Sequence, residues 1–333
     1  MRTRDTPSNT AALVAALRHW AKWLRPPLRD LAPDPYGAVL AGGAYASVDA
    51  FFEAHPSLAA FLARNTALGR GAAAMALRTR CLDDAVRSFT ASGGRQIVIL
   101  GAGLDVRAWR LGRDALRGCT VFEVDSPGSQ RAKLAALARA RLDAASAAAG
   151  TPVRFVAHDF EADGADALPA KLRDAGLDPA APVLTLWEAV LMYLTLDAAA
   201  ATLRAVRSYN AAVAGSRLAL SYLQAPAQRP PLRARLAPWL SPASWLFRAL
   251  AWHAGESFKT AFAPGQAAAW LAQRGCAVRW DKGYRDVAAE LGLDACDDAV
   301  VRRTVAAVSA VWGTSKLHRF ALADVAPPEQ PVA

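Results

Sequence analysis

The sequence predicts an α/β protein built on a Rossmann-like sheet of seven mostly parallel strands. Short apolar runs alternate along the chain with longer segments of helical periodicity. Strands and helices that alternate in this way form parallel sheets through right-handed crossovers. In addition, the first apolar run ends in a glycine pair, and the second, about twenty residues later, ends in an acid. This spacing is typical of a nucleotide-cofactor site, where glycines admit the ligand and the acid binds ribose hydroxyls.

The individual strands are expected where apolar and β-branched residues cluster between turn signals. Such runs occupy residues 96–100, 119–124, 153–157, 183–187, 216–222, about 276–280 and about 317–323. Helical patterns occupy residues 10–24, 47–71 (one or two helices), 72–90, about 128–149, 166–175, 197–213 and 264–274. The last two strands have no clear helical crossover between them, so we expect one strand in this edge region to run antiparallel.

Segments outside this alternation suggest how the chain is organised. Residues 1–90 carry helical patterns only and are expected to form a helical N-terminal cap. Residues 91–325 form the predicted core, which includes an insertion at 224–262 rich in proline and tryptophan. An insertion of this length is often a lid or a binding loop, so we expect it on the acceptor side of the site. Residues 326–333 are expected to be a frayed tail.

Composition limits the classes of protein and of partner. The chain has 333 residues, of which 53% are hydrophobic, enough for a sizeable core. The net charge of +10 is spread over many arginines without a basic block, which argues against a nucleic-acid partner. No apolar run is long enough for a membrane span, and the polar start argues against secretion, so we expect a cytoplasmic protein. The cysteines form no C-x-x-C pair, which predicts free thiols and no metal: Cys81, Cys119, Cys276 and Cys296.

The residues after the glycine pair indicate which cofactor binds. A dinucleotide site prefers glycine or alanine at the third position of the fingerprint, where this chain has Val106. Asp105, just before it, would repel a pyrophosphate at the start of a helix. The same acid suits a cofactor with an amine and a sulfonium. We therefore expect S-adenosylmethionine (SAM) rather than NAD.

Three further strands also end in polar or acidic residues, and parallel strands present their carboxyl ends along one crevice. Asp125 follows the second strand, and Glu188 follows the fourth. Asp159 and the backbone N–H of Phe160 follow the third, where they can meet a nucleobase, although Asp159 can also cap the next turn. Strand alternation points His158 away from Asp159, which weakens its case as a base.

Several segments together resemble the leucine carboxyl methyltransferase family, most closely its bacterial SAM-dependent branch of polyketide and other secondary metabolism. The matching segments are 78–84, 96–108, 123–127, 159–160 and 187–194, with weaker matches at 8–11, 34–36 and 255–258. The resemblance covers about residues 8–325 and implies a class I methyltransferase fold with SAM as cofactor. Four positions depart from the family pattern, since Val106 replaces a threonine, Phe160 a leucine, Ala189 a frequent glycine and Ser257 the usual proline.

The resemblance also implies roles for residues. Gly101 and its neighbours would approach the methionine part of SAM, Asp125 the ribose, and Asp159 with Phe160 the adenine. Glu188 would lie near the methionine or ribose end. Arg80, or Arg78 if the register slips by two, would pair with a carboxylate of SAM or of the acceptor. The full set of expected cofactor-binding residues is Arg80, Gly101, Ala102, Gly103, Asp105, Glu123, Asp125, Ser126, His158, Asp159, Phe160, Glu188 and Ala189.

Catalysis requires little from the protein if the acceptor is a carboxylate, because that group is already ionised at neutral pH. A phenol, with a pKa of about 10, would benefit from a base. The candidate catalytic residues are Arg80, Tyr193 and His253, although Tyr193 could equally be part of the core. No histidine has a compelling acid partner at motif spacing, which mildly favours a carboxylate.

The expected function is therefore SAM-dependent O-methylation of a carboxylate or hydroxyl on an apolar small molecule, acidic or aromatic, in secondary metabolism. One alternative within the class is methyl esterification of a peptide or protein C-terminal carboxylate. Two alternatives of other classes are an NAD(P)-dependent oxidoreductase and a non-catalytic SAM-binding module. The sequence predicts no nucleic-acid or membrane partner and leaves the oligomeric state open.

Overall fold

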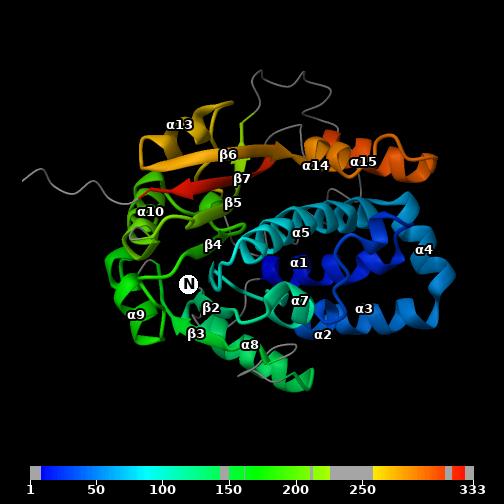
Figure 1. Ribbon diagram of the computed structural model, residues 1–333. Coiled ribbons are helices and arrows are strands. Elements are labelled where there is room, and N and C mark those ends of the chain that lie inside the picture. The colour runs from blue at the N-terminus through cyan, green and yellow to red at the C-terminus, as the bar shows by residue number, and fades with distance from the viewer. Residues whose placement is uncertain are drawn as a thin grey trace, which may run out of the picture.

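A mixed seven-stranded sheet forms the centre of the molecule (Figure 1). The computed structural model describes residues 9–142, 150–160, 162–210, 213–225, 258–311 and 317–326. The strands are β1 (Gln96–Leu100), β2 (Thr120–Asp125), β3 (Val153–Ala157), β4 (Val183–Trp187), β5 (Arg217–Gln224), β6 (Cys276–Gly283) and β7 (Leu317–Val325). Their order is β3-β2-β1-β4-β5-β7-β6, and the first five strands of this order pair in parallel. The predicted strands and the Rossmann-like fold are confirmed.

Helices cover both faces of this sheet. On one face lie α9 (Leu168–Asp174), α10 (Leu196–Asn210) and α13 (Gln266–Ala272). On the other face lie α5 (Ala67–Ala91), α6 (Arg107–Arg110), α7 (Gly112–Leu116) and α8 (Pro127–Arg139). The N-terminal helices pack outside α5 and are α1 (Asn9–Trp20), α2 (Gly37–Ala41), α3 (Gly43–Ala54) and α4 (Pro56–Asn65). Two more helices, α14 (Tyr284–Glu290) and α15 (Ala299–Val311), lie between β6 and β7 in the chain and pack beside α5.

Burial on both faces explains why the central strands read as continuous apolar runs. In β1, Val98 and Leu100 belong to the core under α9 and α10, whereas Ile97 and Ile99 belong to the core under α5 and α8. A strand with helices on both faces needs apolar side chains at every position rather than at alternate ones. β1 pairs with β2 and β4 between these two helical layers, and the glycine turn follows its last residue, Leu100.

The antiparallel strand in the edge region is β7, which lies between β5 and β6 and runs against both. The sequence prediction of one such strand is confirmed, but the two helices that precede β7 were not predicted. A signal for α15 was available, because Val301, Val305 and Val308 recur at helical spacing and are all buried. Asp298 caps this helix by accepting a hydrogen bond from the backbone N–H of Val300 at 2.8 Å.

The long helix α5 begins at residue 67, five residues before its predicted start, and so the predicted boundary near residue 71 is wrong. Thr66 caps the helix, since its side chain accepts a hydrogen bond from the backbone N–H of Leu68 at 3.2 Å. Glycine at position 69 lets the helix pass close to α4, because a Cβ there would lie 1.6 Å from the carbonyl oxygen of Ala63. The glycines therefore serve packing within a continuous helix rather than a break.

The described part of the predicted N-terminal cap contains helices and no strand, but α5 packs directly on β4, β5 and β7. This helix is thus a layer of the core that carries α1 to α4 on its outer side (Figure 1). Within the described ranges, none of the helices has the length and apolar character needed to cross a bilayer. The described residues of α1 to α4 pack with α14, α15 and β7 in one apolar cluster, so these helices and the core share a continuous interior.

A buried ion pair joins β2 to α8. Glu123 and Lys133 are 1% and 2% exposed, and the Lys133 ammonium donates a hydrogen bond to Oε2 of Glu123. The ammonium also lies 5.5 Å from the ring centroid of Trp109. Burial raises the pKa of Glu123 to about 7, although Lys133 acts in the opposite direction. Removing Lys133 would leave an unpaired charge in the core, which is costly.

We expect Lys133→Met to lower the free energy of unfolding by about 3 kcal/mol at pH 8. The loss should be smaller at pH 5.5. Without Lys133 the buried Glu123 takes up a proton more readily in the folded than in the unfolded state, and this proton uptake stabilises the folded variant at low pH. The stabilisation is lost as the pH rises through the pKa of Glu123 in the folded state. Urea denaturation at both pH values measures this. The control is Lys171→Met, at the half-exposed Lys171–Asp163 pair, for which we expect a loss below about 1 kcal/mol. An equal loss at both pH values for Lys133→Met would contradict a buried ion pair between Glu123 and Lys133.

Candidate functional site

A cavity of about 270 Å³ lies at the carboxyl ends of β1, β2 and β4. This is the edge at which ligands bind in doubly wound α/β proteins. The cavity is lined by Thr10, Ala11, Val14, Arg18, Arg78, Ile99, Leu100, Gly101, Ala102, Gly103, Leu104, Asp105, Asp125, Ser129, Phe160, Glu188, Ala189, Val190 and Tyr193. Eight of the thirteen residues expected from the sequence to bind a cofactor are in this lining: Gly101, Ala102, Gly103, Asp105, Asp125, Phe160, Glu188 and Ala189.

The glycine turn leaves bare backbone at the wall of the cavity. Gly101 has a φ of +64°, and a Cβ at this position would lie 2.4 Å from Cγ2 of Val190. Gly103 also has a positive φ, and its backbone N–H donates a hydrogen bond of 2.6 Å to Oδ2 of Asp125. Oδ1 of Asp125 accepts a second hydrogen bond, from the backbone N–H of Ser126 at 2.7 Å. The turn after β1 and the acid after β2 are thus fixed relative to each other.

A network of buried charges forms the opposite wall. The Arg107 guanidinium bonds Asp83 of α5 at 3.0 Å, Glu188 at 2.7 Å, and Asp105. Arg78 of α5 donates a second hydrogen bond to Glu188, at 2.5 Å. Burial alone would raise the pKa of Glu188, but Arg107 and Arg78 outweigh it and hold the pKa well below its usual range. Arg107 likewise lowers the pKa of Asp105 against the effect of burial, so both acids stay ionised.

The first helix closes one side of the cavity. Ala11, Val14 and Arg18 lie on one face of α1 at helical spacing, and all three line the cavity. Arg18 fixes the helix there, because its Nη2 donates to the carbonyl oxygen of Leu104 at 2.7 Å and its Nε to Asp34 at 2.9 Å. The sequence predicted the helix but not this contact, since nothing in a single sequence states which element an amphipathic face will meet.

The backbone after β4 is held in an uncommon conformation. Ala189 has a φ of +57°, in the left-handed region that favours glycine. Its N–H donates a hydrogen bond to Oγ of Ser221 on β5 at 2.8 Å. Val190, the next residue, packs against Gly101 of the glycine turn. Glycine would adopt the positive φ of Ala189 more easily than alanine does.

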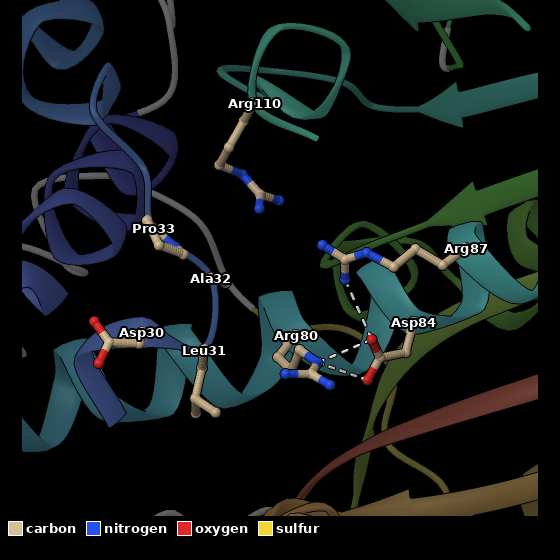
Figure 2. A pocket seen from close by; sticks show the side chains of 8 residues that line it. All are labelled: Asp30, Leu31, Ala32, Pro33, Arg80, Asp84, Arg87 and Arg110. Carbon is tan, nitrogen blue, oxygen red and sulfur yellow. Dashed lines mark hydrogen bonds and ion pairs between the residues drawn. The ribbon is translucent and has the colours of Figure 1, made fainter. Parts of the chain in front are cut away.

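Of the two candidate arginines on α5, Arg78 lines the cavity and Arg80 does not. Two residues correspond to about 200° of rotation along a helix, so the two side chains leave α5 on opposite sides. Arg80 instead bonds both carboxylate oxygens of Asp84 at 2.8 Å (Figure 2). The structure therefore places Arg78, the alternative register, in this cavity, and it places Arg80 outside the cavity.

Four other expected residues lie outside the cavity lining. Glu123 is two residues deeper in β2, where Lys133 covers it. The Ser126 side chain caps α8 by accepting from the N–H of Ser129 at 3.4 Å. His158 is fully buried, with its ring 4.9 Å from that of Phe160, and burial lowers its pKa. Asp159 caps the following turn, as its alternative interpretation predicted, because Oδ1 accepts from the N–H of Ala162 at 3.2 Å.

Tyr193 lines the cavity and contacts the described end of the insertion. Its ring lies 5.5 Å from that of Phe258, which belongs to the described end of the predicted insertion at 224–262. The backbone N–H groups of Lys259 and Thr260 both donate to the carbonyl oxygen of Met192, at 2.8 and 3.2 Å. The last residues of the insertion thus lie beside Tyr193. His253, the third catalytic candidate, lies outside the described residues.

Comparison with known proteins identifies the family. The profile of the leucine carboxyl methyltransferase family matches residues 11–207. The chain belongs to this family. A relative in Mycolicibacterium smegmatis is 36% identical over 65% of this chain and 66% of its own length. Another, in Mycolicibacterium paratuberculosis, is 35% identical over 70% of this chain and 69% of its own. The names of both include "S-adenosyl-L-methionine-dependent methyltransferase".

Coverage differs among the relatives. A third, from Streptomyces coelicolor, is 43% identical over 38% of each chain, so this chain spans less than two thirds of it and of the Mycolicibacterium smegmatis relative. A solved structure from Thermobifida fusca aligns over 90% of this chain and 98% of that one, with 18% identity and a TM-score of 0.49. The predicted membership of the family is confirmed, and the family's cofactor is SAM.

The residues of the cavity fit this cofactor. Its amino-acid end carries an ammonium and a carboxylate, and the cavity offers ionised Asp105 and Glu188 beside Arg18 and Arg78. The bare backbone at Gly101, where a Cβ has no room, accommodates a ligand that lies directly against the turn. Asp125 would hold the ribose, and Phe160, with apolar neighbours on β1, would meet the adenine.

We expect Arg78→Met to weaken binding of S-adenosylhomocysteine by about tenfold, because it removes a cation from the cavity and frees Glu188 from one partner. Isothermal titration calorimetry measures this. Arg80→Met, two residues along the same helix, is the matched control and should leave the affinity unchanged. The placement of Arg78 rather than Arg80 in the cofactor cavity is wrong if Arg80→Met weakens binding and Arg78→Met does not.

Proposed function

We propose that this protein transfers a methyl group from SAM to an oxygen of an apolar small molecule, with a carboxylate as the favoured acceptor. The observation that carries the proposal is the single cavity in which a bare glycine turn, two arginines and two ionised carboxylates meet, beside the aromatic pair Tyr193 and Phe258. The first part of this set suits the amino-acid end of SAM, and the aromatic part suits an apolar acceptor.

SAM supplies an activated methyl group on a sulfonium, so the protein's contribution is to bind, orient and exclude water. Helix α1 covers one side of the cavity and is fixed there through Arg18. Val190 packs on the glycine turn and Tyr193 stands at the acceptor side. These side chains would place the acceptor oxygen in line with the methyl group and keep the space between them dry.

The titratable groups of the cavity favour an acceptor that needs no base. Among the described residues, no histidine lines the cavity. Asp105 and Glu188 are poor bases, because arginines lower the pKa of each. Burial raises the pKa of Asp125, but its carboxylate already accepts two backbone hydrogen bonds and lies at the expected ribose position. A carboxylate acceptor, ionised at neutral pH, requires none of these groups.

We further propose that the reaction belongs to secondary metabolism and takes place in the cytoplasm, without a nucleic-acid or membrane partner. All four cysteines are free thiols, three of them buried, which fits a reducing compartment. The acceptor is expected to enter beside Tyr193, next to the described end of the insertion.

The test is a panel of paired acceptors with purified protein and SAM, read by mass spectrometry of the products. Aromatic and aliphatic carboxylic acids should gain one methyl group, and the matching amides should not. With a carboxylic acid, kcat/KM should be nearly flat between pH 6.5 and 9, because the acceptor, Asp105 and Glu188 all stay ionised. A phenol would instead give a rate that rises about tenfold per pH unit below its pKa of about 10.

Other outcomes would replace the proposal. Methylation of peptide acids but not of small acids would assign a peptide or protein C-terminus as the acceptor. Binding of SAM without turnover on the whole panel would favour a non-catalytic binding module. Enhanced fluorescence of NADH on mixing, with no binding of SAM, would favour an oxidoreductase.

A further inference from the structure

A second cavity, of about 320 Å³, lies beside α5 and is lined by other residues than the cofactor cavity (Figure 2). It is lined by Asp30, Leu31, Ala32, Pro33, Arg80, Asp84, Arg87 and Arg110. None of these residues lines the first cavity. We propose that this arginine-lined cavity binds a small molecule that carries an oxyanion group, a phosphoryl or a carboxylate group.

The three arginines come from two elements and converge on one space. Arg80, Asp84 and Arg87 follow one another at helical spacing on a single face of α5. Arg110 comes from α6, and Figure 2 shows its guanidinium directed toward the space beside Arg80 and Arg87. A guanidinium is planar, always charged and rich in N–H donors, which suits it to bind phosphate and carboxylate groups in a bidentate manner.

Much of the donor capacity of these arginines is unused within the described chain. Arg80 bonds Asp84 through Nε only, and its two terminal amino groups have no hydrogen bond to a described residue. Arg87 donates only through Nη1, at 3.2 Å, to the same carboxylate. Asp84 therefore accepts hydrogen bonds from both arginines, and the remaining N–H groups of Arg80 and Arg87 can bind a ligand.

Arg110 is held in place from behind. It is almost fully buried and bonds Asp83 with two nitrogens at 2.7 Å, so its guanidinium cannot swing away from the cavity. The other acid of the lining, Asp30, bonds its neighbour Arg29 at 2.9 Å, and its carboxylate is directed away from the three arginines in Figure 2. The space itself thus faces three cations and one shared carboxylate.

The size of the cavity indicates the class of ligand. Small-molecule sites in proteins have volumes from about 300 Å³ upward, so the space takes an organic molecule rather than a bare ion. The wall opposite α5 is the segment Leu31–Pro33, two apolar side chains and a proline ring that offer no acid to repel an anion. The ligand's oxyanion would lie between Arg80, Arg87 and Arg110, with its carbon part toward this segment.

The test uses calorimetric titration of the full chain, without SAM, at fixed ionic strength. The probes are inorganic pyrophosphate for the phosphoryl class and citrate for the carboxylate class. We expect saturable binding of at least one probe, weakened at least about tenfold in Arg80→Ala/Arg87→Ala. The probe that binds more tightly assigns the class. The charge-matched control is Arg64→Ala/Arg204→Ala, which removes two exposed arginines elsewhere and should leave binding unchanged.

A second variant guards against a loss that reflects unfolding. Arg80→Lys/Arg87→Lys keeps the charge but removes the planar donors, and we expect an affinity between those of the wild type and of the alanine variant. Affinity for S-adenosylhomocysteine should be the same in all these variants, which separates this site from the cofactor cavity. The inference is overturned if neither probe binds at millimolar concentration, or if the control variant loses as much affinity as the alanine variant.

Discussion

The geometry of the site depends on the ion pairs that the buried Arg107 guanidinium makes. It bonds Asp83 of α5, Asp105 of the glycine turn and Glu188 after β4, three segments that are far apart in the sequence. Glu188 has a second ion-pair partner in Arg78 of α5. The cofactor cavity therefore has walls that are joined by charge-assisted hydrogen bonds, which are stronger and more directional than neutral ones.

This network is costly to assemble but keeps its charge state. Loss of one member of a buried pair leaves an uncompensated charge and typically costs about 3–5 kcal/mol. The arginines hold the pKa values of Asp105 and Glu188 below their usual range, so neither acid gains a proton near neutral pH. The electrostatic environment of the methionine end is thus constant, and the protonation of the acceptor becomes the main source of pH dependence in the reaction we propose.

The sequence predicted what depends on local pattern. Inner strands such as β1 and β4 are apolar runs between turns, and the glycine turn and Asp125 lie at strand ends, where topology alone brings them together. Positions beside these ends were harder to predict. Glu123 is acidic and close to Asp125, yet it lies two residues deeper in the strand, where a lysine from α8 covers it.

What could not be predicted depends on contacts between distant segments. The choice between Arg78 and Arg80 requires the rotation of α5 about its axis relative to the sheet, which the many small residues of that helix leave undetermined. The contact of α1 with the cavity, and the partner acids of Arg107, likewise follow only from tertiary packing. The pattern in α15 was readable but was missed among the short polar segments between β6 and β7.

The most direct test of the proposed cofactor site is a crystal structure of the protein with S-adenosylhomocysteine. We predict that its amino-acid end lies against Gly101, between Arg78 and Glu188, and that its ribose hydroxyls bond Asp125. Helix α1 should cover it through Ala11 and Val14. A ligand bound elsewhere, or one whose ribose lies away from Asp125 while the glycine turn makes no contact with it, would contradict the central claim.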